Sequence, residues 1–360
     1  MTLGKTQLSL FAKATRLGSG KQGVELTDEA CLALLAIAAR DLNALDALPE
    51  VRLQADGINL FSGVPSALNV RLDQQPLAVF SKLVASGVPD VDMYFSCLAA
   101  LHKGRLKYER ILATQPVPTI DQVGPRGLLM YGLLPTDALA ALLLWRKWIF
   151  DIDNRAGQET GYVFEPILAG AIGGTPASAT KSPVHRRADR SKGRQVDCIV
   201  EQDKIAYEFK LRVTIAASGQ GRWSEELEFP EDCKDSGFTP ALVVLDPTSD
   251  PKLTQLQNAF LAAGGRAFVG DAAWDHLESQ AGPSMGVFVE KYIRAPLADI
   301  LARAPDPRAL PGFRVSLSPR GVAFTLGERT ASFPRAEPDP SLSTGADGLP
   351  EDVTEQLPGV

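Results

Sequence analysis

Hydrophobic residues in the first third of the chain recur at the three- to four-residue spacing of amphipathic helices. Thr27 is a suitable N-cap for a helix that runs to about Leu45, with Leu32 and Leu35 on one face. Two further helical patterns cover about residues 76–85 and 91–112, and a connection rich in proline and glycine follows them. We therefore expect residues 1–135 to form a mainly helical region, which contains no motif with a catalytic mechanism.

From Thr136 onward the pattern alternates between helices and strands. Helices are predicted at about 136–150, 158–171, 252–263, 271–279 and 286–303, with a short helix inside 218–235, and strands at 195–200, 205–213, 241–245 and 266–269. The run Ala241–Leu245 is continuously apolar, which is typical of a strand buried on both faces. Residues 136–305 are thus expected to form an α/β (α+β) core, with a mixed central sheet flanked by helices.

The remaining chain divides into a predicted hairpin at 306–330 and an acidic, proline-rich tail at 331–360 that we expect to be disordered. The 360 residues are 45% hydrophobic, which is enough to bury a substantial core. Four scattered cysteines with no CxxC pair argue against a disulfide framework or a zinc site, and they suit a reducing cytoplasm. No apolar stretch approaches the ~20 residues that a membrane span needs, so no membrane partner is expected.

The net charge of −6 does not by itself favour a nucleic-acid ligand, but its distribution changes that picture. The tail carries six acids and one base, a net of −5, which leaves the rest of the chain near −1. The segment 181–194 contains six basic residues against one acid, Asp189. The bases are Lys181, Arg186, Arg187, Arg190, Lys192 and Arg194. Such a cluster creates a local positive field, so this segment is our candidate for contact with DNA phosphates, the alternative being an ordinary exposed loop.

The two strands around Gln202 carry the candidate chemistry. Side chains alternate across a strand, so one face of this hairpin is apolar while the other carries Asp197, Glu208 and Lys210. Closing the hairpin with Glu201 opposite Lys204 places Asp197 directly opposite Glu208, with Cβ atoms about 4.5–5.5 Å apart. Two carboxylates at that distance repel each other unless a cation lies between them, and Mg²⁺ prefers such oxygen ligands.

This arrangement is suited to phosphodiester hydrolysis. A divalent cation polarises a phosphoryl oxygen and lowers the pKa of bound water, and Lys210 can stabilise the charge that develops on the phosphate. The alternative is a half-exposed hairpin whose polar residues are incidental, because E-x-K and D-x-K triplets also occur by chance. Two such triplets, Asp232-Cys-Lys234 and Asp250-Pro-Lys252, lie outside alternating strands.

Asp197, a short hairpin and then Glu208-Phe209-Lys210 resemble the PD-(D/E)XK nuclease signature, although Val196 stands where that motif has proline. The resemblance covers roughly residues 140–300, and the whole chain is similar to the ApaLI-like restriction endonucleases. It implies an additional acid on the preceding helix, which would be Glu165, or else Glu159. Asp197, Glu208 and Glu165 would then hold Mg²⁺, with Lys210 as the fourth catalytic residue.

The resemblance further implies a type II restriction endonuclease that cuts double-stranded DNA at a short palindromic site. A palindrome has two-fold symmetry, so a homodimer is the expected assembly. The helical region 1–135 would then supply a dimerisation or DNA-clamping surface. Two alternatives stay open from the residues: a repair or junction-resolving nuclease of the same fold, and a non-catalytic DNA-binding protein.

Overall fold

A computed structural model describes residues 3–15, 24–49, 75–211, 220–245, 251–306 and 308–336. Its longer N-terminal elements are α1 (Lys5–Thr15), α2 (Asp28–Asp41), α3 (Pro76–Ala85), α4 (Val91–Thr114) and α6 (Thr136–Ala171). Short turns of helix, η1 (Leu45–Ala47), α5 (Ile120–Val123) and η3 (Gly124–Met130), connect them. The C-terminal half contains β1 (Thr175–Ala177), β2 (Val196–Val200), β3 (Ile205–Lys210), α7 (Gln220–Asp235), β4 (Thr239–Val244), α8 (Pro251–Ala262), β5 (Arg266–Val269) and α9 (Asp271–Gln280). None of the helices in these ranges is long and apolar enough to cross a membrane.

The helix capped by Thr27 forms as predicted but ends earlier. The Thr27 hydroxyl accepts the N–H of Ala30 over 3.2 Å, and α2 stops at Asp41 rather than near Leu45. Every residue from Cys31 to Ala39 is buried, so α2 is enclosed on all sides rather than on one face. Its small alanine side chains allow neighbouring elements to pack all round it.

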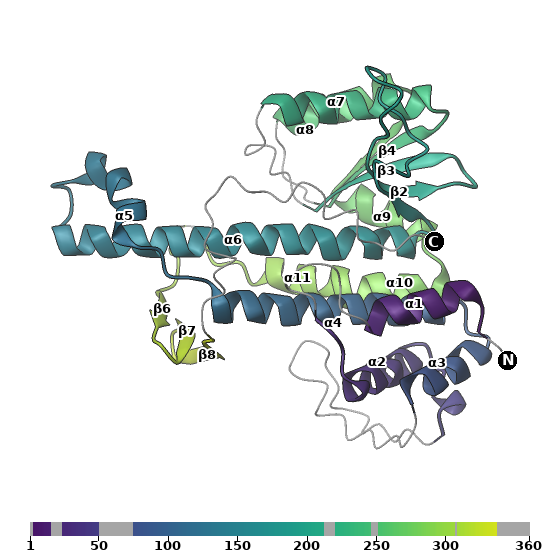
Figure 1. The fold of residues 1–360 in the computed structure, drawn as a ribbon, viewed down its shortest axis with the longest axis horizontal. Helices are drawn as coiled ribbons and strands as arrows, with labels where there is room; N and C mark the ends of the chain where they lie inside the picture. Colours follow the sequence, from purple (N-terminus) through teal and green to yellow (C-terminus); the bar gives the residue numbers. More distant parts are fainter. Residues whose placement is uncertain are drawn as a thin grey trace.

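The prediction of separate helices at 136–150 and 158–171 is wrong, because α6 is one continuous helix of 36 residues. It lies alongside α4 over much of its length (Figure 1). A Cβ atom at Gly104 of α4 would lie 2.9 Å from the side chain of Val163, so the glycine permits close approach of the two helices. Packing of this kind, which the local sequence does not show, keeps the polar middle of α6 helical.

Five of the described strands form a mixed sheet in the order β1-β2-β3-β4-β5, which confirms the predicted fold class. The strands β1, β2 and β3 are antiparallel neighbours, whereas β3, β4 and β5 run parallel. The pairing Val200–Ile205 and Cys198–Tyr207 is the predicted hairpin register. In Figure 1, α7 and α8 cover one face of the sheet, and α9 with the long helices lies on the other.

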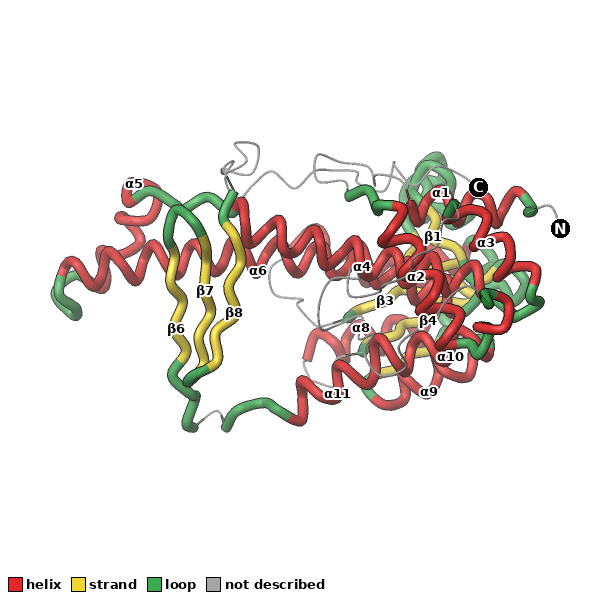
Figure 2. The backbone as a smooth tube through the Cα atoms, turned by 90° about the horizontal axis from the view of Figure 1, so that it is seen from below, coloured by secondary structure: helices red, strands yellow, loops and turns green. Residues whose placement is uncertain are grey.

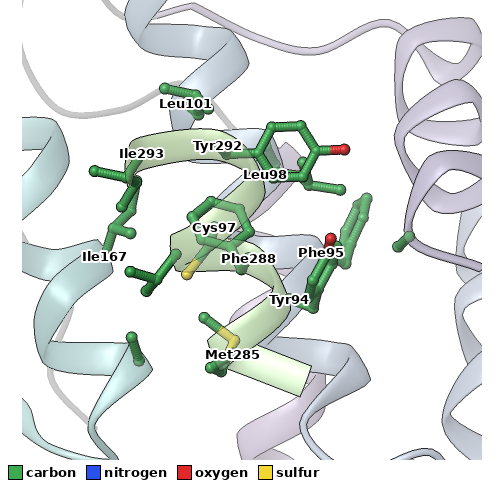
Figure 3. Packing of buried hydrophobic residues seen from close by; sticks show 14 of the residues in the cluster. Tyr94, Phe95, Cys97, Leu98, Leu101, Ile167, Met285, Phe288, Tyr292 and Ile293 are labelled. Atoms are coloured by element: carbon green, nitrogen blue, oxygen red, sulfur yellow. The ribbon is translucent and has the colours of Figure 1, made fainter. Parts of the chain in front are cut away.

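The N-terminal helices and the sheet share one hydrophobic core, so residue 135 does not divide two separately packed units. Tyr94 of α4, Ile167 of α6 and Tyr207 of β3 belong to the same buried cluster. The helix predicted at 286–303 enters this cluster as α10 (Pro283–Val289), a π-helical turn η4 (Glu290–Arg294) and α11 (Ala295–Ala302). Figure 3 shows Phe288 of α10 packed between residues of α4 and α6.

A second sheet closes the described chain. The predicted hairpin is present as β6 (Phe313–Leu317) and β7 (Gly321–Leu326), but a third strand, β8 (Arg329–Pro334), follows it. The expectation that disorder begins at 331 is therefore wrong for 331–334, and residues 337–360 lie outside the described ranges. The sheet packs around Val322 and Trp148 near the end of α4 (Figure 2).

Candidate active site

The structure brings the predicted polar residues together where β2 begins and β3 ends. These strands are antiparallel, so Asp197 near the start of β2 lies beside Glu208 and Lys210 near the end of β3. Both faces of the sheet are largely apolar around this point, since Cys198 and Ile199 are buried on opposite sides. The polar side chains thus form an isolated group at a half-buried position.

Asp197 is held by the neighbouring strand. Its Oδ2 atom accepts the backbone N–H of Phe209 over 2.9 Å. Burial, followed by the nearby carboxylates of Glu208 and Glu165, raises the pKa of Asp197 well above its ordinary value, while Lys210 and the Phe209 N–H oppose this rise. A carboxyl group in these surroundings favours either a proton or a cation.

Glu165 of α6 lies near this group, where its carboxylate interacts with Glu208 and Lys210. Burial is the largest cause that raises the pKa of Glu165 to about 7, and repulsion from Glu208 adds to it against the attraction of Lys210. The helix thus contributes a third carboxylate to the two on the hairpin. The side chain of Glu159, the alternative helix acid, lies outside the described residues.

Lys210 supplies the positive charge of the group. Its Nζ atom donates to Oε1 of Glu208 over 2.8 Å and lies 3.6 Å from Oε1 of Glu226. Burial lowers the pKa of Lys210, but the carboxylates of Glu208, Glu226 and Asp197 together raise it above its ordinary value. The ammonium group therefore stays charged at neutral pH.

Glu226 is the site residue that sequence reasoning missed. It projects from α7, and its Oε2 atom is buried without a hydrogen-bond partner among the described residues. The sequence does not show how the connection between β3 and α7 runs, so it could not place Glu226 next to Lys210. The available signal was weak: an acidic residue in a polar stretch for which only a short helix was expected.

The donor set suits a hard divalent cation such as Mg²⁺. It consists of carboxylate oxygens in excess over a single lysine, and the buried Oε2 of Glu226 has no donor to satisfy it. Within the described ranges no three Asp, Glu, His or Cys side chains are already gathered at metal-binding separations. The Lys210 ammonium bonded to Oε1 of Glu208 serves as the local cation in this arrangement, so a metal ion would compete with Lys210 for the charge of this carboxylate.

With this geometry established, similarity to known proteins decides the family. The family model described as ApaLI-like restriction endonuclease matches residues 66–294. The chain belongs to this family. The matched region contains Glu165, both strands of the hairpin and Glu226, so every carboxylate of the site lies within the ApaLI-like portion.

One curated relative is the "Type II restriction enzyme ApaLI" of Acetobacter pasteurianus, which is 56% identical over 215 residues. The aligned stretch covers 59% of this chain and 57% of the relative, little more than half of either length. No solved structure matches the chain.

The basic segment of this ApaLI-like chain lies against α7, whose acids engage much of its charge. Arg186 donates to Glu225 over 2.9 Å, and Arg187 lies 3.1 Å from Asp235. The other ion pairs of the segment join Arg187 to Glu231, Lys192 to Asp189 and Arg194 to Asp232.

Arg194 departs furthest from the prediction of DNA contact. It is only 5% exposed, and it also donates to the backbone carbonyl of Glu225. Because both of these partners belong to α7, Arg194 holds this helix against the basic segment and is not a surface cation. Lys181 and Arg190, in contrast, are both exposed to solvent.

Proposed function

We propose that this chain is a type II restriction endonuclease that hydrolyses phosphodiester bonds of double-stranded DNA with Mg²⁺. The observation that carries the proposal is the convergence of Glu165, Asp197 and Glu208 around Lys210. The carboxylates come from three separate elements, and only the tertiary fold brings α6 to the hairpin. Membership of the ApaLI-like family and the name of the curated relative support the same activity.

Each residue has a distinct role in this proposal. Asp197, Glu208 and Glu165 would hold Mg²⁺, which when bound supplies a Lewis acid for the phosphoryl group and an acidified water. The hydrogen bond from Phe209 fixes the orientation of Asp197. Lys210, charged at neutral pH, would compensate the negative charge that builds up on the phosphate in the transition state.

The partner in this proposal is duplex DNA with a short palindromic sequence, bound by a homodimer. Each chain carries one set of catalytic carboxylates, so two copies related by two-fold symmetry would cut the two strands. The solvent-accessible cations Lys181 and Arg190 are the members of the basic segment best placed to meet phosphates. The four cysteines are buried and free, which suits the reducing cytoplasm that we propose as its location.

A plasmid cleavage assay with purified protein tests the proposal. We expect nicking and linearisation in Mg²⁺, none in EDTA, and fragments of discrete size that report a fixed recognition sequence. Glu208→Gln should abolish cutting, while Glu228→Gln, an exposed position on α7, is the matched control that should cut normally. A protein that cuts only branched or damaged DNA would instead indicate a repair or junction-resolving nuclease. Binding without cutting would indicate a non-catalytic DNA-binding protein.

A further inference from the structure

Lys210 lies between two carboxylates that are not equivalent. Its Nζ atom is hydrogen-bonded to Glu208 over 2.8 Å, whereas Glu226 is 3.6 Å away. An ammonium group has three donors, and Oε2 of Glu226 is buried with no partner in the described structure. The site thus holds a second, incompletely used acceptor for the catalytic lysine.

Glu208 has two competing roles in the proposed function. Its carboxylate is the present partner of Lys210, and the same carboxylate would ligate Mg²⁺. A carboxylate that commits its charge to a divalent cation offers less to an ammonium group, so Lys210 would lose its principal counterion when the site is loaded. A lysine released in this way would no longer be fixed next to the scissile phosphate.

We propose that Glu226 is a positioning residue that holds Lys210 when Glu208 ligates the metal ion. The lysine would move from Glu208 toward Glu226, a shift that also satisfies the buried Oε2 atom. This inference rests on the proposed function, because it assumes that Glu208 is a ligand and that Lys210 acts on the phosphate.

The surroundings of α7 support this role. The acids Glu225 and Asp232 on this helix face the basic segment, where they bind Arg186 and Arg194. These ion pairs hold α7 against the basic segment. The position of Glu226 relative to Lys210 is therefore fixed by the helix that carries it. Among the described ion pairs of α7, the one made by Glu226 is directed to the catalytic lysine.

A double-mutant cycle in melting temperature tests the proposal without any cleavage. We would compare wild type, Glu226→Gln, Lys210→Met and the double variant, each with and without Ca²⁺ as the metal alone. The coupling between the two positions should be larger in Ca²⁺, because Lys210 then depends on Glu226. Equal coupling in both conditions would assign a purely structural contact and overturn the proposal. Loss of the Ca²⁺-induced melting shift in Glu226→Gln would make Glu226 a ligand and would also overturn it.

Single-turnover cleavage in Mg²⁺ gives a second readout that does not depend on thermal unfolding. Glu226→Gln should slow cleavage roughly 10- to 100-fold, the scale on which misplacing a catalytic group acts. Glu226→Asp should recover part of the rate, and Glu226→Gln should slow a Lys210→Met enzyme no further. Additive losses in the double variant would contradict an action through Lys210. If wild type does not cut DNA at all, the proposed function fails. The double-mutant cycle in melting temperature still shows whether Lys210 depends on Glu226 when metal is bound.

Discussion

The backbone N–H of Phe209 donates to Oδ2 of Asp197 over 2.9 Å, so this carboxylate is a structural acceptor as well as a candidate ligand. Asp197→Asn keeps a side-chain oxygen for the N–H and removes the repulsion from Glu208 and Glu165. Without metal, we expect the free energy of unfolding of Asp197→Asn to equal that of wild type or to exceed it by up to about 0.5–1 kcal/mol.

The Asp197→Ala variant separates the two roles. It leaves the Phe209 N–H without its acceptor and should lose about 1–3 kcal/mol relative to Asp197→Asn. Both variants should fail to cut DNA. Urea unfolding in EDTA, together with plasmid cleavage, measures both effects. Full cleavage by either variant would exclude Asp197 from the site.

The raised pKa of Glu165 predicts that the metal-free protein becomes less stable as the pH rises. The folded protein binds this proton up to about pH 7, whereas the unfolded chain releases it near 4.5, so the free energy of unfolding falls between these values and levels off above them. Glu165→Gln has no proton to release, so its stability relative to wild type should grow across that window by on the order of 1–3 kcal/mol. Denaturant unfolding at pH 4.5 and 8 in EDTA measures the difference. A pH-independent difference would show that Glu165 titrates normally.

The basic segment should separate into binding and structural residues. Replacing Lys181 and Arg190 by alanine should weaken binding to every duplex. The slope of the logarithm of the binding constant against the logarithm of the salt concentration should become less steep by about 0.9 for each phosphate that the protein no longer neutralises. Arg194→Ala should instead destabilise the fold, because it leaves Asp232 buried without its cation. Salt titrations of DNA binding and melting curves distinguish the two outcomes. An unchanged salt slope in the Lys181/Arg190 variant would remove this segment from the DNA interface.

Asp41 is expected to be a stability determinant that takes no part in the candidate site. Its fully buried carboxylate accepts from the hydroxyl of Tyr94 over 3.0 Å and binds Lys291 and Tyr292 of the π-helical turn. Asp41→Ala should cost about 3–5 kcal/mol, since several donors lose a shared acceptor. The exposed Asp46 serves as the matched control, and Asp46→Ala should change the free energy of unfolding by less than about 0.5 kcal/mol. Equal effects at the two positions would show that the network adds nothing.

Two truncations test where the C-terminal sheet ends. Removing 337–360 should leave the melting temperature unchanged, and it deletes six acids and no base, which should tighten DNA binding at low salt. Removing 331–360 also deletes most of β8 and the bonds from Arg335 to the carbonyls of Leu112 and Gln115. That shorter protein should melt earlier, because Val322 would lose part of its cover. Identical melting of both truncations would mean that β8 contributes no stability.

The hairpin could be predicted because its information is local. Alternation assigns each residue of β2 and β3 to a face, and the short turn after Val200 fixes the register that pairs Cys198 with Tyr207. Glu165 was identified from a resemblance to known nucleases, and the structure brings it to Glu208.

The features that were missed depend on tertiary packing. Glu226 reaches Lys210 only because α7 lies across the sheet, and the pairing of Arg194 with Asp232 joins residues 38 positions apart in sequence. The continuity of α6 was missed because its polar middle looks like a break, whereas contact with α4 at Gly104 preserves the helix. Such contacts leave no periodic trace in the sequence.

The shared core has a consequence for engineering. Tyr207 and Phe209 of β3 pack into the same cluster as Tyr94 of α4 and Phe288 of α10. A fragment that begins at residue 136 and is fused to another DNA-binding module would expose to water the apolar side chains that pack against α4 in the intact chain. For the proposed nuclease, retargeting would therefore require grafting new binding elements onto the intact chain, because removing α4 would uncover the same cluster.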